Sequence, residues 1–162
     1  MMDGQRALTT SQSAFELKMP QANRTSNVRL AGLKIMVIDD SKTIRRSAEI
    51  LLQQAGCTVI LAEDGFDALE KISTHVPDLI FADVLMPRLD GYKTCAVLKR
   101  STLYKHIPVV MLTSKDSLFD RARGRSAGSS QHLTKPFTKE TLLTTVEAHI
   151  AVGFAPPKTL HS

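Results

Sequence analysis

The sequence predicts an α/β protein built on a doubly wound, parallel, five-stranded sheet. Three observations support this prediction. Short apolar runs alternate with segments of helical period, the connections between them are short, and several of the apolar runs end abruptly in a polar residue. Regular alternation of strand and helix gives parallel strands with helices on both faces of the sheet. The strand order expected for five such units is 2-1-3-4-5.

Length and composition fit one globular domain. The 162 residues are 43% hydrophobic, which is sufficient for a core, and the net charge of +5 is too diffuse to indicate nucleic-acid binding. Cys57 and Cys95 form no C-x-x-C pair, so we expect packed thiols rather than a zinc site or disulfide scaffold. No apolar run approaches the roughly 18 residues of a membrane span. Without a signal sequence either, a cytoplasmic location is expected.

The two ends of the chain predict no packed structure. Residues 1–32 are rich in Ser, Thr, Gln and Asn and show no sustained period, which is typical of a disordered tail. Residues 33–152 are predicted to form the domain. Residues 153–162 begin with a glycine and contain Pro156-Pro157, and are predicted to form a second tail.

The first half of the domain is predicted to contain three strands and two helices: strand 34–38, helix 42–55, strand 57–62, helix 65–75 and strand 79–83. In the first helix the apolar residues repeat with helical period, at Ile44, Ala48, Leu51, Leu52 and Ala55. In the second helix, Phe66, Leu69 and Ile72 are expected to share one buried face. The third strand is apolar up to Asp83, as expected for a strand that is covered on both faces.

The second half repeats the alternation. A helix is predicted from Asp90, a plausible N-cap, to about residue 100. The elements expected after it are strand 108–112, a weaker helix 117–126, a short strand 132–134 and a last helix from Thr138. The last helix places four apolar residues together: Leu142, Leu143, Val146 and Ile150.

Four of the five predicted strands end in residues that suit phosphate chemistry. These are the pair Asp39-Asp40, then Asp83, Thr113 and Lys135. A single strand-end aspartate more often caps a helix, but capping does not explain four such ends on one edge of a sheet. Clustered carboxylates repel one another unless a cation is present, and Mg²⁺ prefers oxygen ligands. The pattern predicts phosphoryl transfer to Asp83, with Mg²⁺ and Lys135 neutralising charge and Thr113 donating to a phosphoryl oxygen.

These residues resemble the receiver domain of response regulators over residues 33–150. The resemblance is carried by Asp39-Asp40, Asp83 with Pro87, Asp90-Gly91, Thr113-Ser114 and Lys135-Pro136-Phe137. It implies the CheY-like, flavodoxin-like fold and transfer of a phosphoryl group from a histidine kinase to Asp83. It also implies Mg²⁺ bound by Asp40, Asp83 and the backbone carbonyl of Leu85, with Asp39 acting through water. A cis peptide bond before Pro136 is implied as well.

Longer segments, 37–46, 64–69, 86–92 and 135–137, are similar to stand-alone receivers of chemosensory pathways that control type IV pili. This similarity implies a CheA-type kinase as donor and a pilus-motor or adaptor protein as target. Only twelve residues follow Ile150, too few for a helix-turn-helix domain, so no DNA binding is expected. The expected output is phosphorylation-dependent protein binding that controls twitching motility.

The expected partner surface comprises helix 117–126, strand 132–134 and helix 138–150. It carries cationic and apolar side chains, namely Arg121, Arg123, Arg125, Lys139 and either Leu118 or Phe119. The resemblance assigns a conformational switch to Thr113 and to position 132, where receivers often have Tyr or Phe and this chain has His132.

Three alternatives remain at the level of sequence. One is a phosphate sink that drains a chemosensory kinase. Another is a small Mg²⁺-dependent phosphatase with Asp39 as nucleophile, but such enzymes need Asp-x-Asp and this chain has Asp39-Asp40-Ser41. The third is a pseudo-receiver that only binds partners. Such chains usually lose the acidic pair or the lysine, and here all three residues are present.

Overall fold

The structure is a computed structural model that describes residues 30–114 and 127–153. Its parallel sheet has the predicted order, β2-β1-β3-β4-β5. The strands are β1 (Lys34–Ile38), β2 (Thr58–Ala62), β3 (Leu79–Asp83), β4 (Val109–Thr113) and β5 (Gln131–Thr134). The helices are α3 (Lys42–Gln54), α4 (Gly65–Thr74), α5 (Gly91–Lys99) and α7 (Lys139–Gly153). The α/β fold class and the strand order are confirmed.

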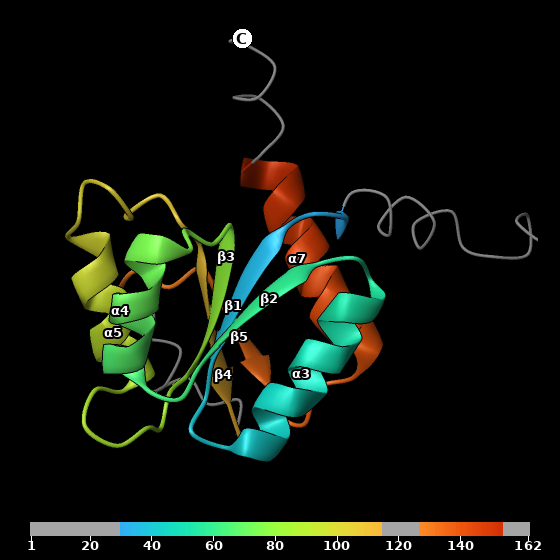
Figure 1. Ribbon diagram of the computed structural model, residues 1–162, viewed down its shortest axis with the longest axis horizontal. Helices are drawn as coiled ribbons and strands as arrows, with labels where there is room; N and C mark the ends of the chain where they lie inside the picture. The colour runs from blue at the N-terminus through green and yellow to red at the C-terminus, as the bar shows by residue number, and fades with distance from the viewer. Residues whose placement is uncertain (1–29, 115–126, 154–162) are drawn as a thin grey trace, which may run out of the picture.

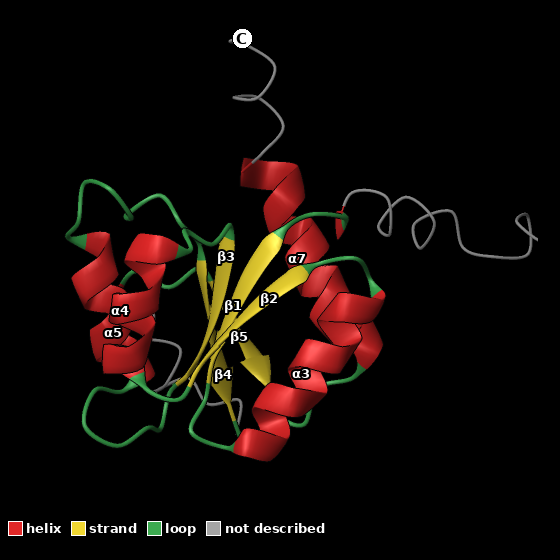
Figure 2. Ribbon diagram, viewed as in Figure 1, coloured by secondary structure: helices red, strands yellow, loops and turns green. Residues whose placement is uncertain are grey.

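Helices cover both faces of the sheet, with α3 and α7 on one face and α4 and α5 on the other (Figure 1). The strands form the middle layer (Figure 2). Successive residues of a strand point to opposite faces, so each strand contributes to two cores. In β3, Leu79 and Phe81 pack with α3 and α7, whereas Ile80 and Ala82 pack with α4 and α5. Because both faces are covered, the strands are continuous apolar runs in the sequence.

Each helix that follows β1, β2 or β3 begins with a capping side chain. The Ser41 hydroxyl accepts a hydrogen bond from the Ile44 N–H at 3.2 Å. The carboxylates of Asp64 and Asp90 accept from N–H groups three residues further on, at 2.8 Å and 2.9 Å. These caps satisfy N–H groups that have no partner within the helix. They also fix where the chain turns after each strand, and the predicted capping role of Asp90 is confirmed.

The prediction that Phe66 shares the buried face of its helix is wrong. Its side chain is 52% exposed, and the buried residues of α4 are Gly65, Ala68 and Ile72. Residues at i, i+3 and i+7 lie on one face of a helix, and Phe66 lies about 100° away from that face. The ring is instead covered by the guanidinium of Arg88, whose carbon lies 5.1 Å from the ring centroid.

The folded part of the chain starts before the predicted boundary at residue 33. Leu30, within the predicted tail, is fully buried in the core beneath α3 and α7. The Gly32 N–H donates to the Gly56 carbonyl at 2.9 Å, which ties this segment to the turn before β2. The apolar residues around Leu30 are interrupted by Arg29 and Gly32 and show no sustained period, so the sequence pattern did not predict its burial. Gly153, predicted to begin the second tail, is the last residue of α7.

Several predictions fall outside the described residues. The predicted helix 117–126, with Arg121, Arg123 and Arg125, lies there, as do residues 1–29 and 154–162 of the predicted tails. Within the described part of the chain, no helix is long and apolar enough to cross a membrane.

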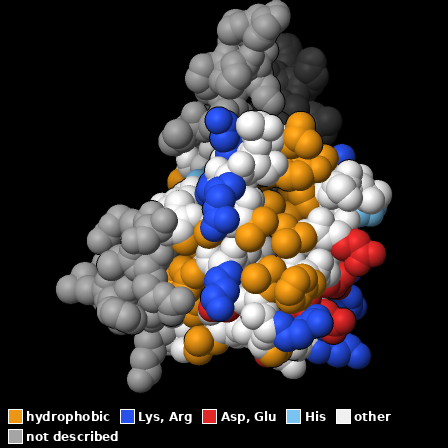
Figure 3. Space-filling view, turned by 90° about the vertical axis from the view of Figure 1, so that its left-hand side faces the viewer, with side chains coloured by type: hydrophobic (Ala, Val, Ile, Leu, Met, Phe, Trp, Pro, Cys, Tyr) orange, Lys and Arg blue, Asp and Glu red, His pale blue; other side chains and the backbone are white. Residues whose placement is uncertain are grey.

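The side of the molecule formed by α4 and α5 carries exposed hydrophobic side chains beside a column of Lys and Arg side chains (Figure 3). Val97 in α5 and Leu103 in the turn after it are both exposed. Residues 91–114 contain no acidic side chain but four basic ones, Lys93, Lys99, Arg100 and Lys105. The α5 part of this side is therefore positively charged, in contrast to the carboxylates at the ends of the strands.

Replacing Gly91 with alanine should destabilise the fold, although alanine normally favours a helix. A Cβ at this position would lie 2.4 Å from the carbonyl oxygen of Asp83, a backbone atom that no rotamer change can move. We expect Gly91→Ala to lower the free energy of unfolding by about 2–3 kcal/mol, measured by urea denaturation.

The matched control is Gly32→Ala. Gly32 has a φ of +84°, but no atom lies within 4 Å of an added Cβ. Only backbone strain opposes that substitution, at a cost of about 1 kcal/mol. Equal losses in the two variants would show that contact with β3 is not what requires glycine at position 91.

Candidate functional site

Three carboxylates lie together at the carboxyl ends of β1 and β3. Asp39 and Asp40 follow β1 directly, and Asp83 is the last residue of β3. The two strands are hydrogen-bonded neighbours. One carboxylate oxygen of each aspartate lies within 4.8 Å of the others, and Asp39 and Asp83 are buried while Asp40 is exposed. The structure therefore brings together the three acidic residues singled out in the sequence.

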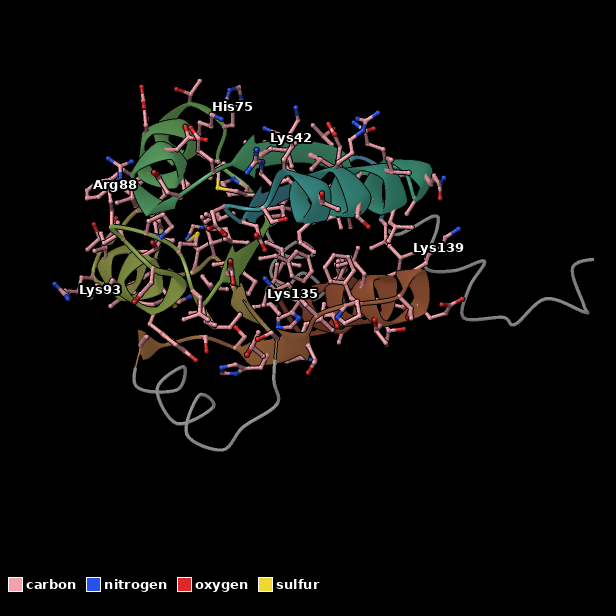
Figure 4. The ribbon with its side chains drawn as sticks, turned by 90° about the horizontal axis from the view of Figure 1, so that it is seen from below. Lys42, His75, Arg88, Lys93, Lys135 and Lys139 are labelled. Atoms are coloured by element: carbon pink, nitrogen blue, oxygen red, sulfur yellow. The ribbon has the colours of Figure 1, made fainter. Side chains whose placement is uncertain are left out.

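Lys135 reaches the same cluster from the end of β5. Its Nζ lies 3.2 Å from an oxygen of Asp39 and 3.2 Å from an oxygen of Asp83. Seen from the edge where the strands end, Lys135 lies near the middle of the molecule (Figure 4). Its backbone N–H donates to the Thr113 carbonyl at 2.7 Å. The end of β4, where the buried Thr113 lies, thus holds Lys135 in place. All four predicted strand ends meet at this edge.

Burial and charge shift the acid–base properties of this cluster. Burial and, second, the neighbouring Asp39 carboxylate raise the pKa of Asp83 to about 6, against the opposing effect of Lys135. Burial alone would lower the pKa of Lys135, but its two carboxylate partners outweigh that effect and raise it. At neutral pH the site therefore holds an ionised Asp83 next to a lysine that keeps its proton.

Backbone and side-chain donors hold the carboxylates in place. The Ser41 N–H donates to Asp39 at 2.9 Å, and the Leu85 N–H donates to Asp83 at 3.2 Å. Arg45, one turn into α3, donates to the backbone carbonyl of Asp39 at 2.7 Å. No sequence pattern predicts this role, because an arginine on a helix has many other uses. The contact of Leu85 shows that the chain turns directly after Asp83.

The donor set fits a hard divalent cation. Three carboxylates face one ammonium group, so negative charge is in excess at this edge. Mg²⁺ takes oxygen ligands and commonly uses one or two carboxylates together with waters and phosphate oxygens. An exposed Asp40 beside two buried aspartates leaves one side of the cluster accessible to such an ion.

Two further features expected from the resemblance can be located. The peptide bond between Lys135 and Pro136 is cis, as expected. His132 lies on β5 beside Met111 of β4, outside the carboxylate cluster. Its Nε2 lies 3.4 Å from the hydroxyl of the buried Tyr92, and the two ring centroids are 6.2 Å apart. His132 therefore contacts the start of α5, and its role in switching stays a prediction.

Comparison with known proteins agrees with this geometry. Residues 35–147 match the response regulator receiver domain. Protein PilG of Pseudomonas aeruginosa is 62% identical over 125 residues, which cover 77% of this chain and 92% of PilG. The alkaline phosphatase synthesis transcriptional regulatory protein PhoP of Bacillus subtilis is 40% identical over 115 residues, covering 71% of this chain. The matched residues span only 47% of PhoP, about half of that relative.

Solved structures give the same result. The chemotaxis protein CheY4 of Vibrio cholerae has a TM-score of 0.70 and 36% sequence identity, and the match covers 73% of this chain and 98% of CheY4. A response regulator structure from Chloroflexus aurantiacus has a TM-score of 0.71 and 32% identity, covering 74% of this chain and 98% of that one.

Replacing Asp83 with asparagine should stabilise the cation-free protein at high pH only. The folded-state pKa of about 6 lies above the unfolded value of about 3.9, so protonation of this carboxyl favours folding. The ionised carboxylate lowers the free energy of unfolding. This destabilisation is absent below about pH 4, grows between about pH 4 and 6, and is complete above that range. We expect Asp83→Asn to raise the free energy of unfolding by about 1–3 kcal/mol near pH 8.

The measurement is urea denaturation in the presence of EDTA, once at about pH 8 and once at about pH 4. Asp78→Asn is the control, because Asp78 lies before β3 at the opposite edge and accepts from the Lys34 N–H. The same gain from Asp83→Asn at both pH values would contradict a charge-based origin.

Proposed function

Because the chain belongs to the response-regulator receiver family, whose members take phosphoryl groups from histidine kinases, we propose that Asp83 is its phosphoacceptor. The family consists of signalling domains, not metabolic enzymes. The observation that carries the proposal is the Lys135 ammonium, which lies 3.2 Å from both Asp39 and Asp83 at the edge that also holds Asp40. This arrangement joins a nucleophile to groups that neutralise a phosphoryl group.

In the proposed reaction a carboxylate oxygen of Asp83 attacks the phosphorus of a phosphohistidine. The O–P bond forms as the P–N bond breaks, and its electron pair returns to the imidazole of the kinase. With a pKa of about 6, Asp83 is largely ionised at neutral pH and so can act as the nucleophile. Lys135 would turn from the two carboxylates to an oxygen of the arriving phosphoryl group. The Thr113 hydroxyl would donate to another of these oxygens.

The carboxylates of Asp40 and Asp83 and the backbone carbonyl of Leu85 would hold Mg²⁺, with Asp39 acting through a water molecule. The cation would neutralise negative charge on the transferring group. The cluster of three carboxylate oxygens within 4.8 Å supports this ligand set. A phosphatase with Asp39 as nucleophile is disfavoured by the family match and by the sequence Asp39-Asp40-Ser41, which lacks the Asp-x-Asp pattern.

Asp83→Asn should abolish phosphorylation by acetyl phosphate, because an amide is a poor nucleophile. Incorporation of radiolabelled phosphate in the presence of Mg²⁺ measures this. Asp78→Asn makes the same chemical change at the opposite edge of the sheet and should leave labelling unchanged. Asp40→Ala keeps the nucleophile and should need a higher Mg²⁺ concentration for the same labelling. Undiminished labelling of Asp83→Asn would rule out this phosphoacceptor.

The similarity to PilG supports a finer proposal, control of type IV pilus twitching motility. In this proposal a CheA-type kinase donates the phosphoryl group in the cytoplasm, and a pilus-motor or adaptor protein binds the phosphorylated form. Thr113 and His132 would change conformation and so transmit the signal toward the surface around β5 and α7. The rival is a phosphate sink that drains the kinase and binds no target.

Activation with beryllofluoride, which mimics the phosphoryl group, should increase capture of one partner other than the kinase in a pull-down. Asp83→Asn should not respond to beryllofluoride, and cells that carry only this variant should lose twitching. Asp78→Asn again serves as the control and should support normal motility. If activation enriches no such partner and motility persists without the protein, the phosphate-sink hypothesis replaces the proposal that the protein controls motility through a bound target.

A further inference from the structure

The loop between β3 and α5 contains an unusual backbone conformation. Arg88 has a φ of 68°, and within residues 30–114 and 127–153 it is the only residue other than glycine with positive φ. The Leu89 N–H donates to the Pro87 carbonyl at 2.8 Å, closing a three-residue turn around Arg88. Such turns are strained, and strained backbone persists only where surrounding contacts hold it.

The Arg88 side chain supplies such contacts. Its guanidinium forms an ion pair with Asp64 and lies over the Phe66 ring, 5.1 Å from the centroid. Asp64 is the N-cap of α4 and is only 8% exposed. Arg88 therefore connects the loop after β3 to the start of α4. In Figure 4 it lies to the side of the strand ends, by α4 and α5 and apart from Lys135.

Close packing leaves the loop little freedom at either side of this contact. A Cβ on Gly65 would lie 2.8 Å from the Leu89 carbonyl oxygen, so the start of α4 touches the loop backbone directly. At the other end, Gly91 packs against the carbonyl of Asp83. Between these points Met86 is buried, while the Leu85 side chain is exposed. Leu85 thus lies between its hydrogen bond to Asp83 and the turn at Arg88.

We propose that Arg88 is a positioning residue for the cation site, which holds the Leu85 carbonyl in place through its contacts with Asp64 and Phe66. This inference rests on the proposed function, in which that carbonyl is a Mg²⁺ ligand. The Arg88 side chain is 63% exposed, and an ion pair with a solvent-exposed cation contributes little to global stability. The contact is therefore better suited to setting the local shape of the loop than to stabilising the fold.

Partners that orient metal ligands typically change metal affinity by about tenfold or more when removed. We expect Arg88→Ala to raise the Mg²⁺ dissociation constant by about tenfold. Titration calorimetry of the full chain with Mg²⁺ alone measures this, and it requires no phosphorylation. The melting temperature of each variant, recorded in EDTA, should stay near the wild-type value.

Arg88→Gly separates the side-chain contact from the backbone strain, because glycine adopts positive φ at little cost. If the contact positions the loop, Arg88→Gly weakens Mg²⁺ binding as Arg88→Ala does. Phe66→Leu removes only the ring beneath the guanidinium and should give a smaller loss in the same direction. The matched control is Arg46→Ala, which breaks an exposed ion pair with Glu49 on α3, where the arginine side chain is 67% exposed. This variant should bind Mg²⁺ normally.

Unchanged Mg²⁺ affinity in Arg88→Ala and Arg88→Gly would overturn the inference and leave the proposed function intact. An equal loss in Arg46→Ala would also overturn it, since the loss would then not be specific to Arg88; the removal of a positive charge by itself favours the binding of a cation. If Arg88→Gly binds Mg²⁺ with full affinity and only Arg88→Ala loses affinity, the loss comes from backbone strain at position 88. That result would overturn the positioning role of the side chain. A wild-type protein that binds no Mg²⁺ would instead refute the cation site itself, and the inference with it.

Discussion

Repulsion between two buried carboxylates is the constraint around which this structure is arranged. Asp39 and Asp83 lie at the ends of adjacent strands, where burial and mutual repulsion keep the pKa of Asp83 near 6. Lys135 relieves part of this repulsion by lying 3.2 Å from each of them. It does so from the end of β5, which lies at the edge of the described sheet beside β4. The site keeps an excess of negative charge that favours a divalent cation over a closed set of ion pairs.

The pleat of the sheet decides which side chains can meet at that edge. Asp83 has the same parity along its strand as Leu79 and Phe81, which face α3 and α7. Asp39 continues the positions of Ile35 and Val37 in the same way, and Lys135 follows Leu133 by two residues. A shift of one residue in any of these strands would move its polar end to the other face. The apolar residues that build one core thus also direct Asp39, Asp83 and Lys135 to one face, whereas Thr113 continues the positions of Val109 and Met111 in the other core.

The loop after β3 joins the site to the α4 side of the molecule. Gly91 packs on the carbonyl of Asp83, Leu85 donates to its carboxylate, and Arg88 contacts Asp64 at the start of α4. The backbone near the proposed phosphoacceptor is thus held by residues from β3, α4 and α5 together. Movement at Asp83 would therefore displace the first residues of α4 and α5, because close packing leaves few independent arrangements.

Local patterns determined most of the fold and the membership of the site. Alternating apolar runs and helical periods predicted the described elements to within a few residues, and polar strand ends indicated the edge where Asp39, Asp40, Asp83 and Lys135 meet. Only the tertiary structure decided that Leu30 is buried, that Phe66 is exposed, and that Arg88 reaches Asp64 across 24 residues of sequence. These features depend on contacts between distant segments, which leave no period in the sequence. Which way a side chain turns is set by the neighbours that the fold brings to it.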